Sequence, residues 1–160
     1  MFDILLLRKG PDSLPQSWFL FDVVLGVSIL LSMAATVVIF PELAPQHILT
    51  LLLAAMTVGF YFLVLYLAGF SGRFAQAMSA IFGIDCLLTL IYLGVYLAVS
   101  AILDRPTALV LTLLLSYWSV PVQGHIISRA IQQHWGIGIG IALTLHLILM
   151  MTYRQISILS

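Results

Sequence analysis

The chain has 160 residues, of which 62% are hydrophobic and only 8% are charged. So few charged side chains cannot cover the surface of a soluble domain, so the composition predicts an integral membrane protein. Six basic and six acidic side chains balance, which removes the positive charge expected of a nucleic-acid-binding protein. The single cysteine, Cys86, excludes an internal disulfide.

Residues 1–16 begin with an apolar segment, MFDILLL, that is too short to cross a membrane. Arg8 and Lys9 follow it, and Gly10 and Pro11 end it. We expect residues 1–16 to lie on the cytoplasmic side, along the membrane surface. Their mixed charge makes a poor signal-peptide start, so the first apolar helix is predicted to be uncleaved.

Five apolar runs follow, separated by short turns that contain proline, glycine or charged residues. Each run has about the 20 residues that a helix needs to cross a bilayer. The sequence therefore predicts an all-α fold, a polytopic transmembrane helical bundle that forms one domain over residues 17–160. The predicted spans are approximately residues 17–40, 47–70, 75–102, 107–131 and 135–153.

The basic residues in the short loops predict the orientation. With the N-terminus in the cytoplasm, four basic residues lie inside and two lie outside. The inner four are Arg8, Lys9, Arg73 and Arg129, and the outer two are Arg105 and Arg154. This bias places the C-terminus on the opposite side of the membrane.

Asp85 lies about ten residues into the third run, or roughly 15 Å deep at 1.5 Å per residue. A carboxylate at this depth must be protonated, paired or hydrated. Asp22 is a shallower acidic residue in the first run.

The fourth run contains the densest group of polar side chains. Pro121 lacks a backbone N–H and crowds the carbonyl four residues earlier, so the helix should bend or open one turn before Gly124. Backbone groups that lose their helical partners at the bend must find other hydrogen bonds within the membrane. The side chains placed to help are Ser116, Tyr117, Ser119 and Gln123.

His125 and Arg129 follow the predicted bend, four residues apart and therefore on one helix face. Both approach Asp85 from the predicted cytoplasmic side, so we expect Asp85 to pair with one of them. Two alternatives stay open: a neutral Asp85 that donates a hydrogen bond to a carbonyl of the bent helix, and an Arg129 that only reaches the interface. His146, near the middle of the fifth run, is either a packed histidine or part of a metal site or proton relay.

The fifth run begins with small residues on two faces. Gly136, Gly140 and Thr144 form one face, and Gly138 with Ala142 forms the second. Small residues let helix backbones approach closely in a membrane. We expect the first face to pack against the third or fourth helix; the alternative is a contact between two copies of the chain.

Sequence motifs give no support for metal, nucleotide or nucleophile chemistry. The chain contains no HExxH, no paired cysteines, no phosphate-binding loop and no GxSxG. We therefore assign no catalytic residue, no metal ligand and no cofactor.

Several features together resemble one known family. They are the five spans, an N-terminal segment that ends in RKGP, an Arg73-Phe74 turn leading into AQAMSAIFGIDCLLTL, and a Tyr117-Trp118 pair ahead of a polar stretch that ends at Arg129-Ala130. This combination resembles the Yip1-type five-helix membrane proteins, in particular small bacterial members. The resemblance implies a compact bundle without known catalysis. We expect it in a bacterial inner (cytoplasmic) membrane, where the distribution of basic residues places the C-terminus in the periplasm. Eukaryotic relatives act in membrane trafficking through a longer cytoplasmic region, so that role is not implied here.

Three functions remain open. The preferred one is a non-enzymatic accessory or scaffold subunit, whose partners are the lipid bilayer and other membrane proteins or a second copy. The second is a small transporter or proton-coupled permease that uses Asp85, His125 and Arg129 at the Pro121 bend. The third is an intramembrane enzyme that acts on lipid. It would need a water-accessible pair of polar groups within hydrogen-bond reach, which Asp22, Asp85 and His125 could supply.

Overall fold

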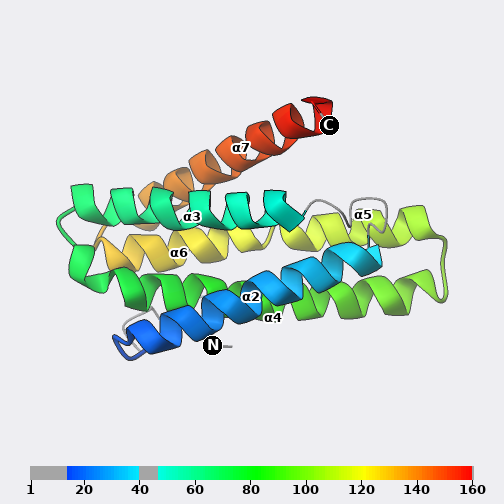
Figure 1. Ribbon diagram of the computed structural model, residues 1–160, viewed down its shortest axis with the longest axis horizontal. Coiled ribbons are helices and arrows are strands. Elements are labelled where there is room, and N and C mark those ends of the chain that lie inside the picture. The colour runs from blue at the N-terminus through cyan, green and yellow to red at the C-terminus, as the bar shows by residue number, and fades with distance from the viewer. Residues whose placement is uncertain (1–13, 40–46, 160) are drawn as a thin grey trace.

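The structure of the protein, a computed structural model, describes residues 14–39 and 47–159 (Figure 1). The described residues form helices and no strand, which confirms the predicted all-α fold. The helices are α2 (Trp18–Ile39), α3 (His47–Leu67), the short 3₁₀ helix η3 (Ser71–Arg73), α4 (Phe74–Ser100), α5 (Arg105–Ser116), α6 (Ser119–Ala130) and α7 (Trp135–Leu159). Among them are five segments long and apolar enough to cross a membrane, and α5 and α6 together make the fourth. The protein is thus a multi-pass membrane protein.

The helices run back and forth between two ends of the bundle (Figure 1). One end holds the start of α2, the turn at Arg73 and the connection from α6 to α7, and we name it the Arg73 end. The other holds the connection from α4 to α5, and we name it the Asp104 end; the C-terminal end of α7 points toward it, away from the bundle (Figure 1). Helices α2, α4 and α7 run from the Arg73 end, and α3, α5 and α6 run toward it.

Helix α4 is the centre of the bundle, because it packs against α2, α3, α5 and α6. Its first half, from Phe74 to Ile84, is buried throughout. Alanine, serine and glycine occupy five of those eleven positions, AQAMSAIFGI after Phe74, and small side chains let neighbouring helices approach on every side. The second half of α4 is more exposed and leaves room for the polar site described below.

The fourth span opens at Tyr117 and Trp118, between α5 and α6. Tyr117 lies four residues before Pro121, whose missing N–H would otherwise donate to the Tyr117 carbonyl in a continuous helix. That carbonyl instead accepts from the Val120 N–H at 3.3 Å. The proline therefore accounts for the position of the break.

Helices α6 and α7 cross at two glycines, Gly124 and Gly138. A Cβ at Gly124 would lie 2.8 Å from the backbone N and Cα of Ile139, and a Cβ at Gly138 would lie against the Gly124 carbonyl oxygen. Ala142, one turn further along α7, is fully buried. By contrast, Gly136, Gly140 and Thr144 are exposed, so the packed face of α7 is the Gly138–Ala142 face and not the one we expected. A helix with small residues on two faces can pack through either, and here the contact with α6 uses the second.

Beyond this crossing α7 diverges from the rest of the bundle (Figure 1). Its main contacts are with α6 and α3. The cavity described below is lined by residues of α7 and by residues on both sides of the α5–α6 break.

Candidate functional site: a polar cavity beside the broken helix

Three polar side chains from three helices form a hydrogen-bonded chain inside the bundle. Tyr61 of α3 donates its hydroxyl to Oε1 of Gln123 at 3.0 Å. Gln123 of α6 in turn donates from Nε2 to Oδ1 of Asp85 on α4 at 3.4 Å. Tyr61 is fully buried, Gln123 is buried and Asp85 is partly exposed. The chain therefore links the protein interior to a carboxyl group that can still be reached.

A second polar pair lies at the start of α6. The Nδ1 atom of His146 is 3.2 Å from the carbonyl oxygen of Ala142, which can only accept, so Nδ1 carries a proton. The other ring nitrogen, Nε2, is 3.4 Å from the hydroxyl of Ser119. In the neutral imidazole this nitrogen accepts, and Ser119 donates to it. The pair thus ties α7 to the first residue of α6.

Asp85 and Gln123 of the first group and both members of the second line one cavity of about 310 Å³. It lies among α2, α3, α4, α6 and α7, next to the end of α5. Besides Asp85, Gln123, Ser119 and His146, its polar lining consists of hydroxyl groups. These belong to Ser28, Ser32, Thr50, Thr57, Thr89, Tyr92 and Ser116.

The hydroxyl of Tyr92 differs from the others in this cavity. It is buried, and it has no hydrogen-bond partner among residues 14–39 and 47–159. Buried polar groups are nearly always hydrogen-bonded. This hydroxyl therefore has unused hydrogen-bonding capacity in a residue that lines the cavity.

A second, smaller cavity of about 240 Å³ continues from the first. The two share Ser32, Thr89, Tyr92 and Ser116, and the second reaches Ile39 and Leu109 near the Asp104 end. Toward the Arg73 end, a block of fully buried apolar side chains follows instead. They are Leu65, Met78, Ile81, Ile126 and Ile127. The polar cavity is therefore closed toward the Arg73 end and continues toward the Asp104 end.

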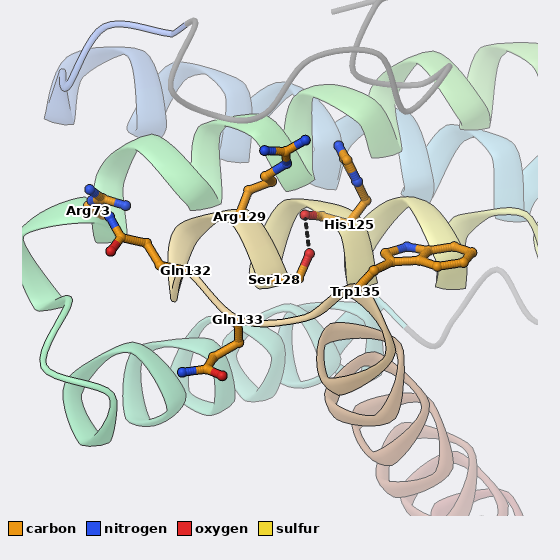
Figure 2. A pocket seen from close by; sticks show the side chains of 7 residues that line it. All are labelled: Arg73, His125, Ser128, Arg129, Gln132, Gln133 and Trp135. Carbon is orange, nitrogen blue, oxygen red and sulfur yellow. Dashed lines mark hydrogen bonds between the residues drawn. The ribbon is translucent and has the colours of Figure 1, made fainter.

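The structure does not bring Asp85 together with His125 or Arg129. Asp85 bonds to Gln123, whereas His125 and Arg129 line a separate cavity of about 610 Å³ at the Arg73 end (Figure 2). Arg129 lies six residues beyond Gln123, which is about 9 Å along a helix axis. The depth estimate from sequence was too coarse to separate the two sites.

The remaining candidate residues lie as follows. Asp22 is exposed on α2 and lines neither cavity. His146 shares the cavity of Asp85. Tyr61 and Tyr92 were not among the candidates, because a tyrosine within an apolar run carries no periodic signal that separates a functional hydroxyl from an ordinary aromatic side chain.

Ser119 and Gln123 were expected to satisfy the backbone at the break. They bond instead to side chains of α7, α3 and α4. Both therefore belong to the polar site rather than to the local repair of the helix.

Comparison with protein-family models, with curated proteins and with solved structures finds no match. The resemblance to Yip1-type proteins therefore stays a prediction.

Proposed function

We propose that the protein is a small proton-coupled permease whose solute site is the cavity around Asp85. One observation carries this proposal: Asp85, Gln123 and His146 line one cavity among the helices, beside an interrupted helix. Transporters build their sites from broken helices and buried ionisable groups near the middle of the membrane. Ionisable residues there are costly and are associated with substrate and proton pathways.

Asp85 is the group that would carry the proton. Its carboxyl group is partly exposed and, among the residues that the structure describes, accepts one hydrogen bond, from Gln123. The ionised carboxylate would accept from Gln123 and from a donor on the solute, and the protonated form would donate to the solute instead. Alternation between these two forms couples the solute to a proton without any cofactor.

The cavity volume restricts the class of solute. Sites for drug-sized ligands have about 300–1,000 Å³, and this one has about 310 Å³. Its lining supplies hydroxyls, an amide and an imidazole around one carboxyl group. We therefore propose a small polar solute that offers hydrogen-bond donors, such as an amine, an amino acid or a small polyol.

Access is proposed from the Asp104 end, because the second cavity leads that way and the apolar block lies on the other side. We assign the Arg73 end to the cytoplasm from the distribution of basic residues. In a bacterial inner membrane the described arrangement would then face the periplasm. Helix α7 is the element proposed to move, because it diverges from the bundle beside the cavity (Figure 1).

The test is solute uptake into proteoliposomes under an inward proton gradient. Vesicles with and without the protein are exposed to a mixture of isotopically labelled amines, amino acids and polyols, and their contents are measured by mass spectrometry. A gradient of two pH units corresponds to about 2.7 kcal/mol, so 1:1 coupling allows accumulation up to roughly a hundredfold. We expect at least one solute to accumulate in a gradient-dependent way.

Asp85→Asn and Asp22→Asn are the matched pair for this assay, because both remove one carboxylate from a membrane span. Asp85→Asn should abolish the gradient-driven accumulation, and Asp22→Asn should preserve it because Asp22 is exposed and outside the cavity. Equal uptake by the Asp85→Asn protein and the wild type would refute the proton-carrying role. No uptake of any solute by the wild type would refute the permease.

The accessory or scaffold subunit is the second candidate, and the exposed face of α7 favours it. Gly136, Gly140 and Thr144 are exposed on that face, and nothing lies within 4 Å of a Cβ at Gly140. Small-residue faces drive helix association in membranes. Mild detergent extraction followed by affinity purification should then recover a stoichiometric membrane-protein partner, and recovery of the chain alone would count against this role.

A further inference from the structure

The cavity at the Arg73 end has the opposite chemistry to the cavity around Asp85. Its volume is about 610 Å³, and its lining includes Arg73, Arg129, Ser128, Gln132 and Trp135 (Figure 2). Two guanidinium groups line it, and no aspartate or glutamate of the described residues does. The site therefore favours an anion.

Arg73 is held in place by several contacts. Its Nη1 atom donates to the carbonyl oxygen of Ala130 at 3.3 Å, and its guanidinium lies 5.2 Å from the centre of the Phe70 ring. With the amide oxygen of Gln132 turned toward Arg73, that oxygen accepts from Nη2 at 2.9 Å and from Nη1 at 3.2 Å. These contacts orient the guanidinium before any ligand arrives, which reduces the entropy lost on binding.

Arg129 complements this fixed group. It is exposed, and within residues 14–39 and 47–159 its guanidinium makes no hydrogen bond or ion pair. Its side chain projects from the last turn of α6, on the same side as His125 (Figure 2). A guanidinium with all its donors unused can bind a phosphate through two parallel hydrogen bonds.

The depth of the cavity identifies the source of the anion. Arg73 precedes α4, Arg129 lies in the last turn of α6, and Trp135 is the first residue of α7. All three therefore sit where membrane spans end, which is the level of the lipid headgroups. Basic pockets between spans at this level suit the headgroups of anionic lipids.

We propose that the cavity at the Arg73 end binds the headgroup phosphate of an anionic phospholipid, with Arg73 and Arg129 as its contacts. The exposed Trp135 ring would lie at the glycerol level beside the bound lipid. This proposal does not depend on the permease, because the two cavities have no lining residue in common.

The test is native mass spectrometry of the full chain in a neutral detergent, titrated with phosphatidylglycerol or phosphatidylcholine of the same acyl chains. We expect the wild type to bind phosphatidylglycerol several-fold more tightly. Arg129→Gln should weaken that binding about fivefold, which is the contribution of one basic residue near an anionic lipid. Arg129→Lys keeps the charge and should recover most of the affinity.

Arg154→Gln is the matched control, because it removes an exposed arginine near the opposite end of the bundle. Arg129→Gln breaks no hydrogen bond of the described residues, so its effect does not depend on damage to the fold. Arg73→Gln should also weaken phosphatidylglycerol binding. Thermal unfolding of this variant is measured as well, because Arg73 joins the α3–α4 turn to Ala130 and its loss can also affect the fold.

Three outcomes would overturn the proposal. The first is equal affinity of the wild type for the two lipids. The second is an effect of Arg154→Gln as large as that of Arg129→Gln. The third is displacement of phosphatidylglycerol by inorganic phosphate at equal concentration, which would identify a site for a free anion and not for a lipid.

Discussion

Gly138→Ala is the substitution for which the structure gives the sharpest expectation. The added Cβ would lie against the Gly124 carbonyl oxygen and 2.7 Å from Cβ of Ser128. Two carbon atoms pack best at about 3.5–4.0 Å, so α7 must move away from α6 by about 1 Å. Neither neighbour can yield, because one is backbone and the other is the first atom of a side chain.

The expected loss of stability follows from two opposing terms. Forcing a methyl group into a packed contact costs about 1–3 kcal/mol. A contact with backbone should cost about 3 kcal/mol, because backbone cannot move aside as a side chain can. Alanine in place of glycine within a helix returns about 0.5–1 kcal/mol. The net expectation is a destabilisation of about 2 kcal/mol.

Gly140→Ala is the matched control on the same helix. Nothing lies within 4 Å of a Cβ at Gly140, so only the helix term applies and the stability should stay equal or rise. The assay is reversible unfolding in mixed micelles with increasing sodium dodecyl sulfate, followed by circular dichroism. Equal stability of Gly138→Ala and the wild type would refute the close crossing of α6 and α7. A loss on Gly140→Ala that depends on protein concentration would instead place a second copy of the chain against the exposed face of α7.

Three further expectations concern single polar groups. Tyr92→Phe removes a buried hydroxyl without a described partner, so stability in the same unfolding assay should not fall. Solute uptake by this variant should fall. Gln123→Leu breaks two interhelical hydrogen bonds of roughly 0.6 kcal/mol each and should lower stability by roughly 1 kcal/mol. Removal of the Tyr61 hydroxyl should then cost less stability in the Gln123→Leu protein than it costs in the wild type. Hydrogen bonds from the Thr107 hydroxyl, and then from the Thr107 backbone N–H, lower the pKa of Asp104. The cap of α5 is therefore intact above the ordinary carboxyl pKa and is lost as the pH falls through the lowered pKa. In Thr107→Ala, an NMR titration should show that the pKa of the Asp104 carboxyl is higher than in the wild type.

The spans and the break in the fourth helix could be predicted because each depends on local chemistry. Length and hydropathy set the five segments, whichever helices later become neighbours. Pro121 removes one backbone donor whatever surrounds it, so the carbonyl of Tyr117 loses its partner in any fold. Both inferences need no knowledge of tertiary structure.

The membership of the polar site could not be predicted in the same way. These helices are apolar on all sides, so no amphipathic stripe shows which face of α4 points toward which neighbour. Asp85 therefore could not be assigned to Gln123 rather than to His125 or Arg129. The same reason applies to α7. The sequence shows two small-residue faces on it, and only the position of α6 decides that the face with Gly138 is the packed one.

The polar chain of Tyr61, Gln123 and Asp85 itself argues for a function that uses it. Apolar side chains of similar volume would fill the same space without the desolvation of an amide and a carboxyl group. A bundle that served only to span the membrane or to hold a partner would be at least as stable with that replacement. The basic cavity at the Arg73 end carries no such cost, because its arginines lie where water and headgroups reach them. The two sites should therefore separate under substitution: Asp85→Asn should abolish uptake and leave phosphatidylglycerol binding unchanged, whereas Arg129→Gln should weaken lipid binding without a loss of stability.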